Sequence, residues 1–170
     1  LADLHLKTHA AHAARLPLRR ARLEGGIQQA PGLPDDLRRR LLEQLAALPD
    51  GDHLLHGDFH PDNVLLTPRG PVIIDWVDAS CGHPAMDVAR TRVLLSAGTP
   101  LQRNPLVILI IQLIRRLFYR AYLETYRRHS PEVVRLSDAF IPIVAAARLN
   151  EGIVPEHATL MKLAEGQIKL

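Results

Sequence analysis

The feature that most constrains the fold is the stretch LLHGDFHPDNVLLTPRGPVIIDW, from Leu54 to Trp76. In it, short aliphatic runs are separated by glycine and proline. Runs of this length and composition are typical of short strands joined by tight turns. The four residues from Pro68 to Pro71 have turn composition and separate VLL from VII. They predict a small β-hairpin with buried arms.

The segments on both sides of this stretch have the apolar spacing of helices. The helices that this spacing predicts cover residues 1–16, 36–48, 85–97, about 103–129, 131–149 and 155–168. Asp35 is a good N-cap for the second of them, and residues 24–34, EGGIQQAPGLP, have the composition of a loop. Pro142 predicts a kink in its helix. The predicted fold class is therefore mainly α, of the α+β kind: a helical bundle with one small β-hairpin.

Length and composition indicate one globular domain over residues 1–170. Apolar residues make up 47% of the chain and charged residues 23%, which are ordinary values for a soluble protein. The single Cys81 cannot form a disulfide within the chain, so we expect a reducing, cytoplasmic environment.

Neither a membrane nor a nucleic acid is an expected partner. The most apolar run, LVILII at 106–111, is far shorter than the ~20 residues of a membrane-spanning helix. The formal net charge is +3, and the arginines are scattered along helical segments, which is typical of a solvated face.

Polar side chains are concentrated within the predicted strand unit. Asp58 follows a glycine in a loop, Asn63 opens the first arm of the hairpin and Asp75 ends the second arm. A hairpin brings its two ends together, so we expect Asn63 and Asp75 to face each other across its base. An amide oxygen and a carboxylate there would suit Mg²⁺. Phosphate oxygens and water molecules would complete its coordination shell. Asp58 could then accept a proton from a hydroxyl nucleophile, and the three residues together predict phosphoryl transfer.

The motif HGDFHPDN followed by IIDW resembles the catalytic core of the aminoglycoside phosphotransferase and choline kinase group, distant relatives of protein kinases. The pattern of that group is H-G-D-x-x-x-x-N, a short hairpin and then I-D-[WF], the counterpart of two protein-kinase motifs. GHPAMDVAR and LADLHLKTH also resemble stretches of the group, so the resemblance covers most of residues 1–97. It implies the C-terminal lobe of a protein-kinase-like fold that uses ATP and Mg²⁺ to phosphorylate a small-molecule alcohol, aminoglycoside-, choline- or sugar-like.

The resemblance also implies a role for each residue that matches the motif. Asp58 would be the catalytic base, or would orient the substrate hydroxyl, while Asn63 and Asp75 would bind Mg²⁺. Leu65 and Ile74 would form the apolar floor under the adenine of ATP.

Other polar residues are expected to support this machinery or to be solvated. His56 and His60 would stabilise the catalytic loop through hydrogen bonds. Asp87 would hold that loop from the following helix, unless it is an early-helix acid that interacts with the helix dipole. Asp62 and Asp78 are expected to be solvated turn residues.

Three N-terminal histidines, His5, His9 and His12, share one face of the first predicted helix. They form either a metal site or a surface stripe. Their alanine-rich surroundings contain no carboxylate at the same spacing, which favours the surface stripe.

Two other functions stay open at this point. His56, Asp58 and His60 could be the transition-metal ligands of a hydrolase, although that interpretation leaves the pairing of Asn63 with Asp75 unexplained. The other alternative is a non-catalytic helical binding module derived from a kinase. The presence of Asp58, Asn63 and Asp75 together argues against it.

A kinase of this kind also needs a strand-rich lobe with a phosphate-covering loop and a lysine. Nothing before residue 50 has that pattern, since there is no G-x-G-x-x-G and Lys7 lies in a predicted helix. We therefore expect this chain to lack the N-terminal, nucleotide-clamping lobe and to be inactive alone. The exposed lobe interface is expected to promote association. The late helices mix acids with arginines, so they do not identify the acceptor.

Overall fold

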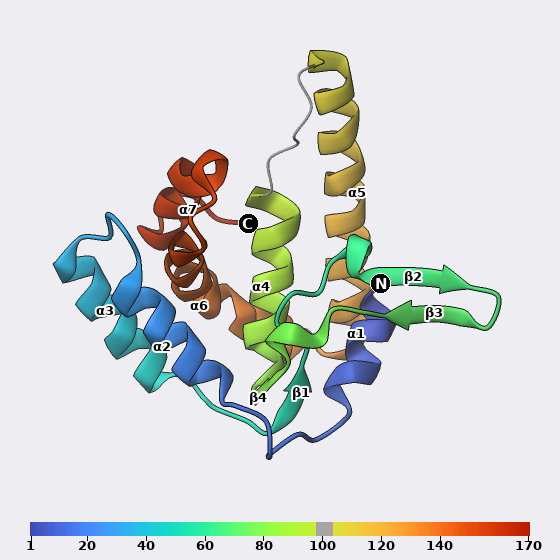
Figure 1. The fold of residues 1–170 in the computed structure, drawn as a ribbon, viewed down its shortest axis with the longest axis horizontal. Helices are drawn as coiled ribbons and strands as arrows, with labels where there is room; N and C mark the ends of the chain where they lie inside the picture. Colours follow the sequence, from blue (N-terminus) through green and yellow to red (C-terminus); the bar gives the residue numbers. More distant parts are fainter. Residues whose placement is uncertain (98–103) are drawn as a thin grey trace.

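The computed structural model describes residues 1–97 and 104–170. Its helices are α1 (Ala2–His9), α2 (Arg19–Gln29), α3 (Asp35–Ala47), α4 (Pro84–Ala97), α5 (Pro105–His129), α6 (Pro131–Arg148) and α7 (His157–Ala164). Its strands are β1 (His53–Leu55), β2 (Val64–Thr67), β3 (Gly70–Ile73) and β4 (Ser80–Gly82). Short 3₁₀ segments are η1 (Pro61–Asn63), η2 (Trp76–Asp78), η3 (Leu149–Glu151) and η4 (Val154–Glu156). The prediction of a mainly helical fold with a small β unit is confirmed (Figure 1).

Helix α4 lies at the centre of the fold, and most of its side chains are buried. It packs against α6, which also contacts α2 and α7 (Figure 1). A helix that is buried on all sides must be apolar or must carry polar groups that have partners. Helix α4 does both, because Val88 and Ala89 lie in the core beside the buried polar residues Asp87 and Arg90. The central helix therefore brings two charged groups to the strand unit.

Helix α2 contradicts the prediction of a loop over residues 24–34, because it continues through two glycines to Gln29. Glycine lowers helix propensity by about 1 kcal/mol, which made the segment resemble a loop. Gly26 has a packing role instead: a Cβ atom on it would lie 2.9 Å from the Cβ of Ala147 on α6. The close approach of α2 to α6 requires the missing side chain.

Other helix boundaries also differ from the prediction, among them those of α7, which covers His157–Ala164 and not 155–168. Helix α1 ends at His9 rather than near residue 16, because the following backbone pairs with the strand unit: Leu54 donates to the carbonyl of Ala11 across 2.8 Å. Asp35 is the first residue of α3 and not its cap, since Pro34 occupies the N-cap and no side chain caps the helix. Helix α6 runs through Pro142 as one helix. Residue 103, the predicted start of the helix that ends at 129, lies outside the described residues.

The predicted hairpin is confirmed as β2 and β3, which pair antiparallel from Val64 opposite Ile73 to Thr67 opposite Gly70. Its arms are not buried as predicted, because the hairpin extends away from the helical body (Figure 1) and Leu66 is 88% exposed. Strands β1 and β4 form a second antiparallel pair. Of these two strands, β4 was not predicted from the sequence.

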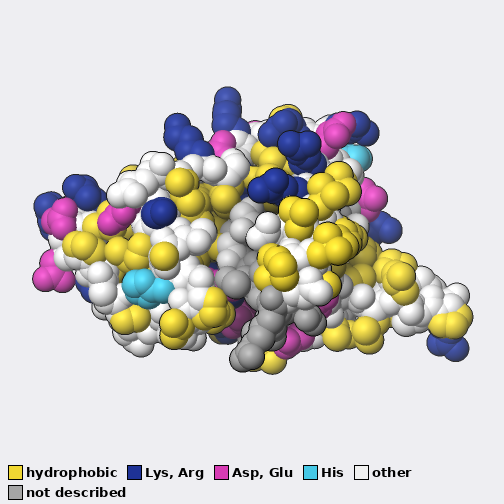
Figure 2. Space-filling model, turned by 90° about the horizontal axis from the view of Figure 1, so that it is seen from above, with side chains coloured by type: hydrophobic (Ala, Val, Ile, Leu, Met, Phe, Trp, Pro, Cys, Tyr) yellow, Lys and Arg dark blue, Asp and Glu magenta, His cyan; other side chains and the backbone are white. Residues whose placement is uncertain are grey.

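The first half of α5 leaves a row of large apolar side chains exposed. These are Leu106, Leu109, Ile110, Leu113, Ile114, Leu117 and Phe118. Figure 2 shows that hydrophobic side chains reach the surface on the face that it views. Among the described helices, none is both long and apolar enough to cross a membrane.

Candidate active site

The loop between β1 and η1 is held by the carboxylate of Asp87 on α4. Oδ2 of Asp87 accepts from the backbone N–H of His56 across 2.7 Å, and Oδ1 accepts from the N–H of Gly57 across 2.9 Å. Gly57 has a φ of +85°, and a Cβ atom there would lie 2.5 Å from the carbonyl oxygen of Asp78. The loop that presents Asp58 is therefore fixed by a buried acid and by a conformation that requires glycine.

Two histidines of α1 complete the surroundings of Asp87. Nε2 of His5 and Nε2 of His9 lie 2.9 Å and 3.2 Å from its Oδ2. The other ring nitrogens form hydrogen bonds with the hydroxyls of Tyr122 and Tyr126 on α5. Burial lowers the pKa of His5 to about 4, so its ring is neutral at pH 7 and donates to Asp87 from Nε2.

The prediction of a surface stripe is therefore wrong for His5 and His9, which are buried, and holds for His12, which is exposed. Within the described part of the chain, His5, His9 and Asp87 are also the metal-ligand side chains that converge, to within 4.8 Å. Their ligand atoms already make hydrogen bonds with one another, with tyrosines and with the backbone, so this cluster acts as a buried hydrogen-bond network. This network supports the loop that presents Asp58.

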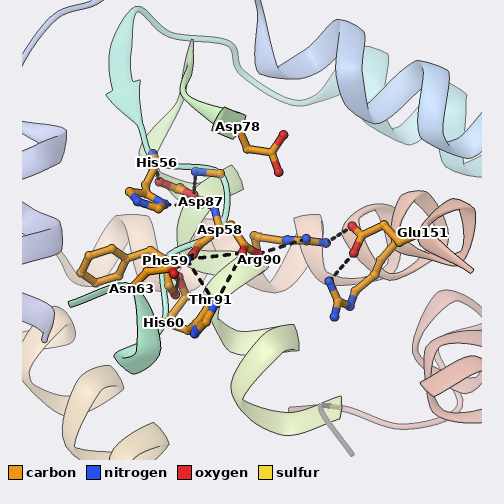
Figure 3. A network of polar contacts seen from close by, with 12 residues as sticks. His56, Asp58, Phe59, His60, Asn63, Asp78, Asp87, Arg90, Thr91 and Glu151 are labelled. Carbon is orange, nitrogen blue, oxygen red and sulfur yellow. Dashed lines mark hydrogen bonds and ion pairs between the residues drawn. The ribbon is translucent and has the colours of Figure 1, made fainter. Parts of the chain in front are cut away.

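Asp58 lies beside two side chains that favour its ionised form, His60 and Arg90 (Figure 3). His60 Nε2 lies 3.4 Å from Oδ2 of Asp58, and Arg90 donates to Oδ1 across 3.2 Å. The hydrogen bond from His60 is the largest cause, and the charge of Arg90 adds to it. Together they outweigh partial burial and lower the pKa of Asp58 to about 2. Asp58 is therefore a carboxylate at every physiological pH.

Arg90 connects Asp58 to the C-terminal end of α6 (Figure 3). Its Nη1 donates to Glu151 across 2.6 Å, and Glu151 also accepts from Arg148 across 2.5 Å. Arg148 pairs in addition with the buried Glu156 across 2.7 Å. This series of ion pairs ties the catalytic loop to helices far along the chain.

Asn63 and Asp75 lie at the base of the hairpin. The backbone N–H of Ile74 donates to the carbonyl of Asn63 across 3.0 Å. Asp75 directly follows Ile74, so its backbone lies close to Asn63. The Asn63 side-chain nitrogen donates to the backbone carbonyl of Asp58 across 2.8 Å, which directs the amide towards the catalytic loop. Asp75 is exposed and has a φ of +62°, in the left-handed region that aspartate tolerates better than most residues.

The remaining residues singled out from the sequence have separate environments. His56 uses both ring nitrogens, since Nε2 donates to the carbonyl of Ile74 across 2.9 Å and Nδ1 accepts from the N–H of Asp58 across 3.3 Å. Leu65 is half-exposed on β2, and Ile74 is partly buried just beyond β3.

Asp62 and Asp78 were both predicted to be solvated, and the prediction is wrong for Asp78. Asp62 has a largely exposed side chain, as expected, and lies 3.6 Å from His60. Asp78 is instead half-buried and forms an ion pair with Arg22 across 2.8 Å.

Several residues of the site were not identified from the sequence. They are Arg19, Arg90, Tyr122, Tyr126, Arg148 and Glu151. For Arg90 a local signal was present: a cation three residues after Asp87 in a helix whose neighbours are apolar has to find a buried partner. The others come from distant segments, and no local pattern indicates them.

The helical body, the loop held by Asp87 and the hairpin base define the C-terminal lobe of a protein-kinase-like phosphotransferase. A family model described as the phosphotransferase enzyme family, APH, matches residues 1–136, and the chain belongs to this family. The chain is also similar to acyl-CoA dehydrogenase family member 11 of Rattus norvegicus, with 34% identity over 82 residues that cover 39% of this chain. That match spans 10% of the length of the relative.

Proposed function

We propose that this protein transfers the γ-phosphate of ATP to a hydroxyl group of a small molecule, with Mg²⁺ as the cofactor. The observation that carries the proposal is the position of Asp58, an ionised carboxylate at the wall of a cleft, with the amide of Asn63 beside it. Membership of the phosphotransferase family supports the same class of reaction.

In the proposed reaction, the acceptor oxygen forms a bond to the γ-phosphorus of ATP. The bond from that phosphorus to the β–γ bridging oxygen breaks, and ADP leaves. The hydroxyl proton passes to the carboxylate of Asp58. A pKa of about 2 makes Asp58 a weak base, which suits a loose transition state in which the positioning of the hydroxyl contributes more than early removal of its proton.

We assign Mg²⁺ to the oxygen atoms of Asn63 and Asp75. Carboxylate and amide oxygens are ligands that Mg²⁺ prefers. The Asn63 side-chain nitrogen donates to the carbonyl oxygen of Asp58 and to its Oδ2, which leaves the Asn63 side-chain oxygen for a metal. No hydrogen bond or ion pair within residues 1–97 and 104–170 engages the side chain of Asp75. When bound, Mg²⁺ neutralises charge on the phosphates. Leu65 and Ile74 are proposed to contact the adenine.

The hydrolase alternative is less well supported. A metal ligand needs a free nitrogen, and both ring nitrogens of His56 are engaged with the backbone. His60 faces Asp58 at 3.4 Å, but these two groups without His56 form an incomplete ligand set for a structural or catalytic Zn²⁺.

The test is a phosphorylation screen with the full-length gene product, including any residues encoded before Leu1. It would be incubated with ATP, Mg²⁺ and a panel of alcohols, and phosphate esters would be detected by mass spectrometry. We expect an ester that forms together with an equal amount of ADP and that is lost when EDTA is added. Phosphate release from ATP at the same rate with and without every alcohol would contradict the proposal, because it would indicate a hydrolase.

A further inference from the structure

The cleft beside Asp58 has a volume of about 740 Å³, which is large enough for a small organic molecule. Gly26 on α2 and Ala147 on α6 lie in its walls together with Asp58. Neither Asn63 nor Asp75 lines it. The cleft therefore lies on the acceptor side of the catalytic loop, away from the residues proposed for Mg²⁺ and ATP.

Arginine dominates the charged lining of this cleft. The charged residues in its walls are Arg19, Arg22, Arg90 and Arg148, and the acids Asp58, Asp78 and Glu151. The described walls thus contain four guanidinium groups and three carboxylates. A cleft complementary to a cationic acceptor would have the opposite excess.

Three of the arginines have carboxylate partners in the cleft. Arg22 pairs with Asp78 across 2.8 Å. Arg90 pairs with Asp58 across 3.2 Å and with Glu151 across 2.6 Å. Arg148 pairs with Glu151 across 2.5 Å. These ion pairs neutralise three cations and leave one.

Arg19 is the cation that remains. It is 7% exposed, and among the described residues its Nη2 donates only to the carbonyl of Gly57, across 3.5 Å, while its buried Nε finds no hydrogen-bond partner there. No carboxylate of the described residues forms an ion pair with it: the nearby Asp78 pairs with Arg22, and the nearby Asp87 binds the catalytic loop. Burial lowers the pKa of Arg19, which reflects the cost of an uncompensated charge.

We propose that the acceptor is an anionic alcohol, with a carboxylate or phosphate group that binds Arg19 while its hydroxyl meets Asp58. This inference rests on the proposed function and specifies its substrate class. A planar guanidinium matches both anions because it can donate two parallel hydrogen bonds to them. The bound anion would supply the partner that the buried Arg19 lacks.

The first test measures anion binding without turnover. The full-length gene product would be melted in sodium phosphate, in sodium acetate and in sodium chloride of equal ionic strength. We expect phosphate or acetate to raise Tm by about 3 °C at ten times its Kd, and the one that does so identifies the anionic group. The shift should disappear in Arg19→Gln, survive in Arg19→Lys at reduced size, and be unchanged in Arg39→Gln, whose side chain is exposed on α3. No shift in the wild type, or the same shift in Arg19→Gln, would overturn the proposal.

The second test compares acceptors of different charge. In the phosphorylation screen, the alcohol with the highest kcat/KM should carry a carboxylate or phosphate, and Arg19→Gln should raise its KM by about tenfold or more with a smaller change in kcat. A best acceptor that is cationic or neutral would overturn the substrate class and leave the phosphotransferase function intact. An anion-dependent Tm shift at Arg19 without any ester formation would instead contradict the phosphotransferase function and leave the anion site standing.

Discussion

Arg90 donates to Asp58 across 3.2 Å, so the carboxylate proposed to receive the substrate proton is hydrogen-bonded to a permanent cation. Arg90 is almost fully buried and is also anchored by Glu151. A cation in this position fixes the carboxylate in one orientation and keeps it ionised. Asp58 is therefore suited to orient an acceptor hydroxyl and is a weak base. This is expected for phosphoryl transfer, in which positioning contributes more than early removal of the proton.

Removal of this cation should make the activity sensitive to acid. The hydrogen bond from His60 and the charge of Arg90 lower the pKa of Asp58 to about 2, so Asp58 does not titrate in the wild type above pH 4. Arg90→Gln should raise that pKa, so that a larger fraction of Asp58 is protonated at pH 4.5. We expect the ratio of kcat/KM at pH 4.5 to that at pH 7.5 to be lower in this variant than in the wild type, with a difference that grows as the acid pH is lowered. His60→Ala should act in the same direction, and Arg39→Gln is the control. Profiles of the wild type and Arg90→Gln that superimpose would exclude electrostatic control of Asp58 by Arg90.

Loss of the buried carboxylate that holds the catalytic loop should be costly. Burial raises the pKa of Asp87, but the charge that the His5 and His9 rings carry when protonated, together with their hydrogen bonds to the carboxylate, outweighs it and holds the pKa well below its usual value. The stabilisation is therefore present above the usual carboxyl pKa and is lost as pH falls through the folded-state value. In Asp87→Asn, the amide NH₂ group would face the backbone N–H groups of His56 and Gly57, so donors would meet donors in a buried site. The substitution should lower the free energy of unfolding by about 3 kcal/mol or more.

Urea denaturation at pH 7 measures this loss. The matched control is Asp36→Asn, since Asp36 is exposed on α3 and should change the free energy of unfolding by less than about 0.5 kcal/mol. Equal stabilities of the two variants would show that Asp87 does not support the loop.

Two adjacent glycines of α2 should respond in opposite ways to alanine. At Gly26 a Cβ atom would lie 2.9 Å from the Cβ of Ala147, so Gly26→Ala should destabilise the protein by about 1–3 kcal/mol through overpacking. At Gly25 a Cβ atom would meet no atom of the described residues within 4 Å, so Gly25→Ala should stabilise the protein by about 0.4–1 kcal/mol. Thermal denaturation of both variants measures the difference, and effects of the same sign would contradict the packing of α2 on α6.

The assignment of Mg²⁺ gives a prediction about metal dependence. Asp75→Asn removes a charged ligand without changing its size, so the Mg²⁺ concentration that gives half-maximal turnover should rise by about tenfold or more. Asp62→Asn is a suitable comparison, because Asp62 is exposed and lies outside the proposed metal site. A Mg²⁺ dependence that is the same in both variants would remove Asp75 from the metal site.

The parts of the site that lie close together in the sequence were predictable. Asp58, Asn63 and Asp75 fall within one loop and hairpin, so their spacing alone determines that they come near one another. The hairpin itself follows from local turn composition, and the resemblance to the phosphotransferase family, confirmed by the family match, rests on the same short motifs. Local chain geometry decided these features.

The features that the sequence did not predict depend on tertiary contacts. His5 and His9 were predicted to form a surface stripe because Asp87, the carboxylate to which both are hydrogen-bonded, lies some 80 positions further along the chain. Gly26 resembled a helix breaker because its partner Ala147 belongs to a distant helix. In each case a local pattern was overridden by a contact that only the folded chain supplies.

The most direct test of the account is the rate of phosphate transfer by Asp58→Asn. In the full-length gene product, with ATP, Mg²⁺ and the best acceptor from the screen, kcat should fall by about 10²- to 10⁴-fold while Tm stays close to that of the wild type. Asp36→Asn, the surface control, should retain the wild-type kcat. A kcat for Asp58→Asn within about twofold of the wild type would contradict the assignment of Asp58 as the residue that receives the hydroxyl proton.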